Sequence, residues 1–534
     1  MKPKLIFFLV APIAFLIISF IYIHHAALYF TGGVDPEFNY LFNGITLAHL
    51  KLHLNAVGHP GTPIQCLIAL VAWIVHLFRP GQSLWDDVIL NPDLYIRATV
   101  YTANVINAVF LFLLGKQVYA YSKSLTSALV LQFTPFAFLM TLEVSYRLMP
   151  ELIMTSIISC WIMLFVKIIY EQPIERDYKR YSLLFAILFG FSLADKLTFL
   201  PFFTIPLLIL PNWKLRLRYT VLSVIAFFIF AFPVLFNFNK FFGWVTDIFT
   251  HKGVYGSGER GIIDIDLFLS NFRIMLNSTS QILIPLGVLI ILTLVYSIAR
   301  GMKNITVRLS GAVILLFIFH YAITAKHYAF YYLTPSLLMS VFTGFMSFFI
   351  LKSLLRSSSN TKIPEILLSG FVLVLLVSVI PRANRQLSAL KDRKEIMEKA
   401  VSEFKPFLAK DPKIICPGYY GCSSPEYGLL FGLHESGRYG TELSAMVKRH
   451  YPATVFYMPW LNRFYDGVHK VTPQSFIKPG VAYTLFIADY STDLLNNVLA
   501  ALIPDSTKFR QEVMLQYESG PTAEAVFSME FKEK

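Results

Sequence analysis

The chain has 534 residues, of which 55% are hydrophobic and only 15% are charged. A water-soluble globular protein of this length does not need so apolar a composition, so the sequence predicts a membrane protein. The formal net charge of +13 would suit a nucleic-acid-binding protein. Much of the basic excess, however, lies in short loops between apolar runs, where cytoplasmic loops of membrane proteins carry it. We therefore expect the lipid bilayer as a partner and no nucleic acid.

About eleven apolar runs approach the 20 or so residues that a membrane helix needs. The first, Leu5 to Ile23, is longer than the apolar core of a secretory signal and is expected to be a retained span. A further stretch, Pro63 to Phe78, could be a span or a helix lying along the membrane interface. The other runs are Ile96 to Leu114, Leu125 to Val144, Pro150 to Ile169, Tyr181 to Ala194, Thr198 to Leu210, Tyr219 to Phe236, Ile282 to Ile298, Leu309 to Ala325, Tyr331 to Leu351 and Ile366 to Ile380.

The charges in the connections decide between these alternatives. If Pro63 to Phe78 lies on the surface, the basic connections all fall on the amino-terminal side, as expected for cytoplasmic loops. The sequence thus predicts a multi-pass protein of the cytoplasmic (inner) membrane with its amino terminus inside and its carboxyl terminus outside. The basic residues are Lys116 and Lys123; Arg176, Lys179 and Arg180; Lys214, Arg216 and Arg218; Arg300, Lys303 and Arg308; and Lys352, Arg356 and Lys362.

The composition becomes that of a soluble protein after Pro381 and stays so for about 150 residues, a common domain size. Short apolar runs at Thr454 to Met458 and Ala482 to Ile487 indicate strands. A hairpin is predicted where Val513 to Tyr517 and Glu524 to Phe531 flank a Gly-Pro pair. We expect a transmembrane domain at 1–380, which includes a first outer loop at 24–95, and an extracytoplasmic α/β domain at 381–534.

Three polar residues of the first outer loop are candidates for chemistry. Asp35 and Glu37 stand in the sequence GGVDPE shortly after the first span, where carboxylates could meet a substrate whose tail lies in lipid. They could equally belong to a solvated turn, since Gly-Gly and Asp-Pro are common loop signals. His59 precedes the interfacial helix and could bind an anionic head group with help from the helix dipole, or be a plain polar loop residue.

Four charged residues lie where predicted spans begin or end. Arg147 precedes the span that opens at Pro150, and Glu151 lies in its first turn, where an acid is favoured by the helix dipole. Asp195 and Lys196 interrupt an apolar hairpin. Charges at such depth are unfavourable unless they are paired or functional, and internal pairing and ligand binding both remain open.

A basic and aromatic cluster completes the set, with Lys326 and His327 followed by the sequence YYLTP that starts at Tyr331. An aromatic belt at the membrane interface explains the tyrosines, but it does not readily explain the two cations. The predicted topology places all of these candidates on the outer side, which favours one functional site there.

The order of these features resembles the GT-C fold glycosyltransferases, nearest to the protein mannosyltransferase and aminoarabinose transferase group. The resemblance covers roughly the first 350 residues. It rests on an acid in the first loop, a His-Pro-x-x-Pro entry to an interfacial helix, Arg-x-x-Pro-Glu opening a span, Lys196 within a hairpin, and a Tyr-Tyr-Leu-x-Pro segment. It implies transfer of a sugar from a polyprenyl phosphate to a lipid, glycan or protein acceptor at the outer face, usually with inversion.

The resemblance also implies roles for residues. Asp35 would act as the general base or orient the acceptor, while Arg147, Lys196, Lys326 and His59 would surround the departing phosphate. Many relatives carry adjacent Asp-Glu where this chain has Asp35-Pro36-Glu37, so the identity of the base and any metal binding stay open. We expect no cofactor and no required divalent metal, although an oligosaccharyltransferase-like enzyme would need one.

The alternative function is a transporter or flippase of a lipid-linked or anionic solute. Its buried charges would line a pathway through the membrane. The sequence lacks the matching halves with Gly or Pro interruptions that inverted-repeat transporters often show, and this absence favours the enzyme.

Overall fold

The computed structural model describes residues 5–173, 177–355, 363–502 and 509–533, and Arg176, Arg356 and Lys362 lie outside them. The chain divides by its contacts into two compact units. The first, called the helical unit, comprises Met1–Ile23, Val57–Ile64 and Val100–Arg385. The second, called the α/β unit, comprises His24–Ala56, Gln65–Thr99 and Gln386–Lys534. Most of the first outer loop therefore belongs with the carboxyl-terminal domain.

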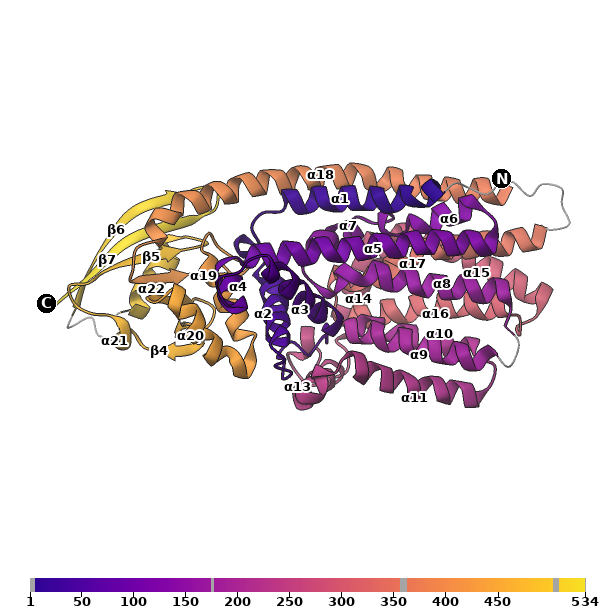
Figure 1. The fold of residues 1–534 in the computed structure, drawn as a ribbon, viewed down its shortest axis with the longest axis horizontal. Coiled ribbons are helices and arrows are strands. Elements are labelled where there is room, and N and C mark those ends of the chain that lie inside the picture. Colours follow the sequence, from indigo (N-terminus) through magenta and orange to yellow (C-terminus); the bar gives the residue numbers. More distant parts are fainter. Residues whose placement is uncertain (1–4, 174–176, 356–362, 503–508, 534) are drawn as a thin grey trace. The chain divides into compact units, whose positions relative to one another are not determined.

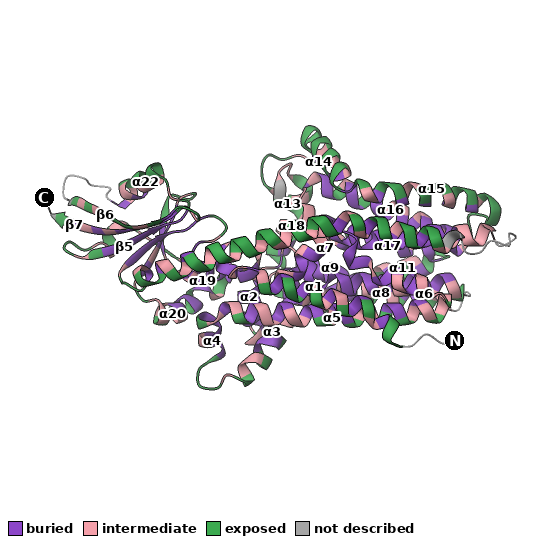
Figure 2. Cartoon of the chain, turned by 90° about the horizontal axis from the view of Figure 1, so that it is seen from above, coloured by how far each residue is buried: buried purple, intermediate pink, exposed green. Residues whose placement is uncertain are grey.

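Seven helices of the described residues are long and apolar enough to cross a membrane. Each coincides with a predicted run, so the protein is a polytopic membrane protein. Helices at the surface of the bundle, such as α15 and α18, expose much of their apolar surface, whereas the centre is buried (Figures 1 and 2). The seven are Leu5–His25 (η1 and α1), Pro92–Ser122 (α5), Pro150–Glu171 (η5 and α8), Ser280–Arg300 (α15), Ile305–Lys326 (α16), Phe330–Leu354 (η9 and α17) and Glu365–Leu408 within α18 (Ile363–Leu408).

The other four predicted runs are helical but shorter, broken or more charged. Helices α9 (Tyr178–Asp195) and α11 (Trp213–Phe230) have 18 residues each, with basic side chains near their amino ends. The run from Thr198 becomes η7 (Leu197–Phe203) and α10 (Thr204–Ile209). The run from Leu125 breaks near Pro135, whose ring lacks an N–H for the helix ladder. Its pieces are α6 (Leu125–Gln132), η3 (Thr134–Phe136), α7 (Leu139–Glu143) and η4 (Val144–Tyr146).

Close packing joins the helices that carry the charged candidates. The buried Trp161 of α8 donates from Nε1 to Ser192 Oγ of α9 at 3.1 Å. Helix α9 also meets α11 at Gly190, where an added Cβ would lie 2.5 Å from the Cβ of Ala226. Small residues permit such close backbone approach. These contacts fix the end of α9 relative to α8, and the two helices carry Asp195 and the residues that follow Glu151.

Helix α3 (Thr62–Leu77) matches the stretch that could have been a span or an interfacial helix. Its 16 residues extend for about 24 Å, less than the roughly 30 Å of a hydrocarbon core. Leu70, Trp73 and Leu77 on one side are exposed. Both observations favour the interfacial placement.

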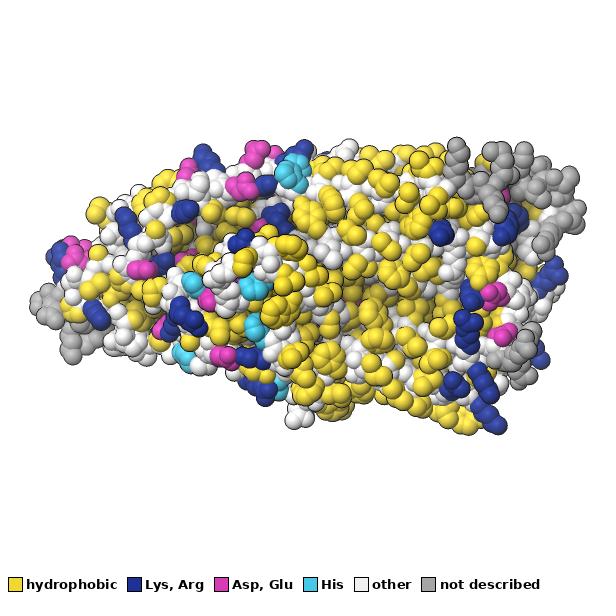
Figure 3. All heavy atoms as spheres, in the orientation of Figure 1, with side chains coloured by type: hydrophobic (Ala, Val, Ile, Leu, Met, Phe, Trp, Pro, Cys, Tyr) yellow, Lys and Arg dark blue, Asp and Glu magenta, His cyan; other side chains and the backbone are white. Residues whose placement is uncertain are grey.

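The predicted basic connections gather at one end of the helical unit, where Lys and Arg side chains collect at the right of Figure 3. Hydrogen bonds between residues at the ends of neighbouring helices also place these connections together. Tyr121 and Tyr181 both donate to the carboxylate of Glu171, each at 2.7 Å, and Arg308 donates to the carbonyl of Leu210 at 2.9 Å. The side of the membrane on which this end lies remains a prediction.

The α/β unit is built on a seven-stranded sheet of the described residues, in the order β4-β3-β2-β1-β5-β7-β6. Strand β1 pairs in parallel with β2 and β5, and the other pairs are antiparallel. The two short predicted strands and the terminal hairpin are confirmed. The strands are β1 (Lys413–Cys416), β2 (Thr454–Met458), β3 (Arg463–Asp466), β4 (His469–Val471), β5 (Ala482–Ile487), β6 (Phe509–Ser519) and β7 (Glu524–Glu533).

Helix α2, which carries the first-loop acids, packs on α19 of the carboxyl-terminal domain. A Cβ on Gly428 or Gly432 would lie 2.5 or 2.3 Å from the rings of Phe38 and Phe42, respectively. Only glycine permits such close ring contact. The described α-helices of this unit include α2 (Val34–Ala48), α4 (Leu84–Leu90), α19 (Pro425–His434), α20 (Gly440–His450), α21 (Pro473–Phe476) and α22 (Thr492–Leu502), together with most of α3, residues 92–99 of α5 and the second part of α18.

Candidate functional site

A buried ion pair stands at the centre of the candidate residues of the helical unit. Lys196 follows the last residue of α9, and its ammonium donates to Oε1 of Glu151 in η5 (Pro150–Ile153). Both side chains are almost fully buried. The ion-pair partner of Lys196 is thus Glu151 and not its neighbour Asp195.

Three carboxylate oxygens at or next to this ion pair have no hydrogen-bond partner in the part of the chain that the structure describes. Asp195 is fully buried, and both of its carboxylate oxygens lack a hydrogen-bond partner among the described residues, as does Oε2 of Glu151. The backbone carbonyl of Asp195 accepts from Gly61 N–H at 3.1 Å, which joins the His59 loop to the end of α9. Buried polar atoms are rarely left without partners, and those that are mark strained or functional places.

Two tyrosine rings cover the Lys196 ammonium. Its Nζ lies 4.7 Å from the ring centre of Tyr331 and 4.9 Å from that of Tyr332, both in η9 (Phe330–Leu333). A cation near aromatic faces is held by the ring quadrupole, more strongly where water is excluded. Lys196 is therefore held on one side by a carboxylate and on the other by π-systems.

His59 joins this cluster through Tyr332. Its Nε2 lies 3.1 Å from the Tyr332 hydroxyl, and its ring meets the Trp244 ring at 4.6 Å between centres. Burial, aided by repulsion from the nearby Lys196, holds the pKa of His59 well below the usual value of 6.5. His59 is thus a neutral hydrogen-bonding group at neutral pH, and not one of several clustered cations.

Lys326 and His327, at the carboxyl end of α16, contact the carboxyl end of α13 (Phe238–Thr250). Helix α13 also carries Trp244. Lys326 Nζ donates to the carbonyl of Ile248 at 2.6 Å, and Nε2 of His327 lies 3.1 Å from the same oxygen. Burial lowers the pKa of His327. Both side chains thus satisfy a helix-terminal carbonyl, while α13 connects them to His59.

Arg147 is half-buried and extended, between η4 and η5. Its backbone carbonyl accepts from the N–H of Met149 at 3.2 Å, which shapes the turn before Glu151. Arg147 therefore lies in the turn that leads into η5, the segment that carries Glu151.

Asp35 and Glu37 belong to the α/β unit and differ sharply in exposure. Asp35 is exposed, at the non-helical start of α2, whereas Glu37 is fully buried. The Glu37 carboxylate lies against Gly33, with Oε2 3.4 Å from the place of an added Cβ. The exposed Asp35 carboxylate is accessible to a substrate hydroxyl, whereas the Glu37 carboxylate is shielded from solvent.

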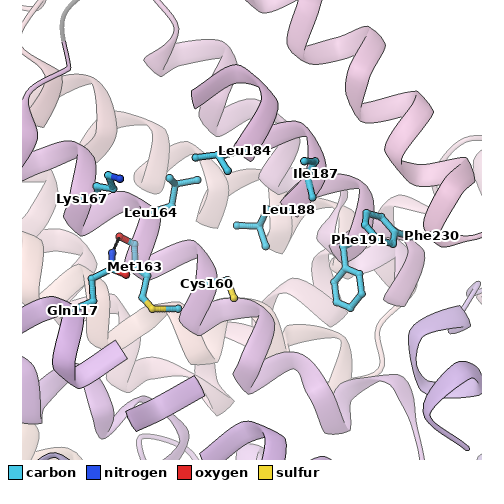
Figure 4. Close-up of a pocket in the computed structure, with 10 residues that line it drawn as sticks. All are labelled: Gln117, Cys160, Met163, Leu164, Lys167, Leu184, Ile187, Leu188, Phe191 and Phe230. Atoms are coloured by element: carbon cyan, nitrogen blue, oxygen red, sulfur yellow. Dashed lines mark hydrogen bonds between the residues drawn. The ribbon is translucent and has the colours of Figure 1, made fainter. Parts of the chain in front are cut away.

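A cavity of about 400 Å³ lies among α5, α8, α9 and α11. Figure 4 shows the residues that line it, of which only Gln117 and Lys167 carry an amide or a charge, and none belongs to the candidate site. Gln117 donates to the carbonyl of Met163 at 2.7 Å. An apolar cavity beside membrane helices suits a lipid chain better than a sugar phosphate.

Sequence reasoning did not single out Trp244, Tyr255 and Tyr332. Tyr332 contacts both Lys196 and His59, and the Tyr255 hydroxyl lies 2.8 Å from that of Tyr331. The position of Tyr332 beside Tyr331 was a usable signal, and the apolar residues around Trp244 recur at helical spacing along α13, whereas the sequence around Tyr255 gives no comparable signal. Within the described residues, no three His, Cys, Asp or Glu side chains form a group that could hold a metal ion.

No protein-family model matches the sequence, and no curated protein matches it. Among solved structures, the chain is similar to the crystal structure of ArnT from Cupriavidus metallidurans bound to undecaprenyl phosphate. The sequences are 11% identical and the TM-score is 0.52, over 97% of this chain and 96% of that chain. The chain has a GT-C-like fold. The predicted fold class, a polytopic helical membrane protein with a carboxyl-terminal α/β domain, is confirmed.

Proposed function

We propose that the protein is a membrane glycosyltransferase that transfers a sugar from a polyprenyl-phosphate-linked donor to an acceptor. A fold alone hosts many functions, so the proposal depends on a site. The observation that carries it is Lys196, a buried ammonium between a carboxylate and two tyrosine rings at a helix end. The similar ArnT structure, which is bound to undecaprenyl phosphate, supports a lipid phosphate as the ligand of such a cation.

Lys196 would bind the donor phosphate, since charge-assisted hydrogen bonds to phosphate are strong. The phosphate then competes with Glu151 for the ammonium, and the tyrosine rings keep the cation in place during the exchange. Tyr331, Lys326, His327, His59 and Arg147 are proposed as neighbours of the donor head group. Asp195 would hydrogen-bond hydroxyls of the sugar through its unpartnered oxygens.

Asp35 is the proposed base. It takes the proton of the acceptor hydroxyl while that oxygen forms a bond to the anomeric carbon of the sugar. The bond from this carbon to the phosphate oxygen breaks, and the prenyl phosphate leaves with its electron pair. A single displacement inverts the anomeric centre. Glu37 is kept as the alternative base, although its burial does not favour it.

The proposed location is the cytoplasmic membrane, with the reaction at the extracytoplasmic face. We propose the protein mannosyltransferase and aminoarabinose transferase group as the group that the chain resembles in function, with a lipid, a glycan or a protein as the acceptor. No metal is required in this proposal, because Lys196 can neutralise the departing phosphate. A chelator should therefore leave turnover unchanged, and rescue of a chelator-treated enzyme by Mg²⁺ or Mn²⁺ would contradict the metal-free mechanism.

The test is reconstitution of the purified full chain with undecaprenyl-phosphate-linked radiolabelled sugars and membrane extracts as the source of acceptor. We expect labelled product and release of undecaprenyl phosphate, together with a polyprenyl phosphate in native mass spectra. Sealed vesicles provide the second measurement. If the chain moved the intact donor across the vesicle membrane and transferred no sugar, the flippase alternative would replace the enzyme.

A further inference from the structure

The parallel strands of the α/β unit end at a place where such sheets commonly bind ligands. From β1 the chain passes through α19 and α20 to β2 on one side, while β5 lies on the other side of β1. Open α/β sheets bind ligands beyond the carboxyl ends of strands where the strand order reverses in this way. A ligand of this sheet is therefore expected to contact the residues that follow β1, β2 and β5.

Three exposed aromatic side chains lie there and form what we call the aromatic patch. Tyr419 and Tyr420 follow β1 and are 63% and 72% exposed, and Trp460 follows β2 and is 44% exposed. The Tyr419 ring lies 5.0 Å from the Tyr420 ring and 5.5 Å from the Trp460 ring, in edge-to-face contacts. Clustered exposed aromatic rings are unusual on a protein surface unless they bind something.

An exposed carboxylate adjoins the segment that carries the patch. Asp489 follows β5 and is exposed. Its Oδ2 lies 2.7 Å from the place of a Cβ on Gly418, the residue before Tyr419. A hydrogen-bond acceptor thus lies beside the segment that carries Tyr419 and Tyr420.

The Asp35 segment is bound to the same segment. Val34 N–H donates to the carbonyl of Tyr420 at 3.3 Å, and Tyr427 donates from its hydroxyl to the carbonyl of Tyr419 at 3.3 Å. Burial raises the pKa of Tyr427, with smaller contributions from Cys422, Tyr419 and Asp35. The proposed base therefore lies near the aromatic patch within the α/β unit.

We propose that the aromatic patch binds the saccharide part of the acceptor and directs one of its hydroxyls to Asp35. This inference rests on the proposed function and adds the class of the acceptor, a glycan or glycolipid. A pyranose ring has an apolar C–H face that fits aromatic rings, and a rim of hydroxyls that fits Asp489 and Asp35. A bilayer surface is the less suitable occupant, because the exposed Asp489 and Asp35 adjoin the chain segment that carries Tyr419 and Tyr420, and lipid head groups are often anionic.

Binding of the full chain in nanodiscs to a printed array of neutral, amino-sugar and uronic-acid oligosaccharides tests the proposal. We expect the wild-type protein to bind at least one of these glycans. Tyr420→Ala and Trp460→Ala should each weaken that binding by about tenfold, the scale of losing one aromatic contact of 1.4 kcal/mol. Matched controls are Met514→Ala and Leu515→Ala on β6, whose side chains are 64% and 49% exposed in the same unit, and these should bind like the wild type.

Three outcomes would overturn the proposal. The wild-type chain could bind none of the glycans, the patch variants could bind as well as the wild type, or a spin label at Leu461 beside the patch could be shielded by lipid. The array needs no sugar donor. A chain that transfers sugar but binds no glycan therefore contradicts the acceptor site alone, whereas one that binds glycan and uses no prenyl-linked donor contradicts the proposed function.

Discussion

Lys196 and Glu151 are 45 residues apart in the chain, and each depends on the other. Two charges taken out of water are unfavourable unless they are paired well, and removing one partner of a buried pair typically destabilises a protein by about 3 to 5 kcal/mol. A loss of activity after a single substitution would therefore not separate a structural role from a role in binding. A test of Lys196 therefore has to change Glu151 as well, so that no unpaired charge is left buried.

Lys196→Ala should abolish sugar transfer and also lower the melting temperature, because it leaves Glu151 buried and unpaired. The double variant Lys196→Ala with Glu151→Gln should recover most of the melting temperature, since it buries no unpaired charge, but should still transfer no sugar. Thermal unfolding in detergent and donor turnover measure the two effects. Recovery of turnover in the double variant would assign Lys196 to structure alone.

Asp35→Asn should lower turnover by about 100- to 10,000-fold, the usual contribution of a positioned general base, while donor binding and melting temperature stay near the wild-type values. Asn keeps the shape of the side chain but cannot take the proton. Glu37→Gln is the control, since the buried Glu37 should mainly affect stability. A fully active Asp35→Asn together with an inactive but folded Glu37→Gln would exchange the two roles.

His59 should make the protein sensitive to acid. Its folded pKa lies below its unfolded value of 6.5, so the unfolded chain binds the proton first. Its contribution to stability is present above pH 6.5 and is lost as the pH falls, by up to about 1.4 kcal/mol per pH unit. The melting temperature of His59→Asn should consequently decline less than that of the wild type between pH 6.5 and 4.5. Parallel declines would show that His59 is protonated in the folded state.

The periodic patterns predicted the helices and strands well, whereas the break near Pro135 was missed although this proline stands inside the predicted run. The strands Thr454–Met458 and Ala482–Ile487 have the predicted bounds, because short apolar runs between turn signals have few other solutions. The run from Leu125 met the composition of a span but is broken into short pieces. The break lies near Pro135, which lacks an N–H for the helix ladder. The sequence did not reveal the tertiary contacts of the same run, such as the Gln132 amide that donates to the carbonyls of Phe8 and Leu111 at 2.8 and 2.9 Å.

The basic connections carry a topological prediction. Cysteines introduced at Lys179 and Lys214, both exposed, should resist impermeant thiol reagents added outside intact cells. A cysteine introduced at the exposed Arg438 should be labelled from outside. Arg438 is a better test position than the nearby Ser436 or the first-loop Glu37, because these two residues are buried and would label poorly on either side. Labelling of Lys214 from outside would invert the predicted orientation.

For the molecule as a whole, the sequence predicted the fold class; it named candidate site residues, whose roles stay predictions, but did not reveal the residues that they contact. The order of motifs was sufficient for a GT-C-like fold. It was not sufficient to place the first outer loop in the α/β unit, because that depends on Phe38 and Phe42 facing Gly428 and Gly432, nearly 400 residues away in the chain. The available signal was the four-residue spacing of the two phenylalanines on α2 and of the two glycines on α19. This spacing indicates a contact only once the two helices are known to pack together.

The short helical segment that follows Lys196 is expected to affect the surrounding bilayer at its exposed residues, Leu200 and Leu208. Segments η7 and α10 together extend for about 23 Å, against roughly 30 Å for a typical hydrocarbon core. Lipids next to a span that is too short compress to match it. The membrane should therefore be dimpled beside Lys196, so that a phosphate head group there sits deeper than in the surrounding leaflet. Short-chain lipids would remove the elastic strain of this dimple, and long-chain lipids would increase it.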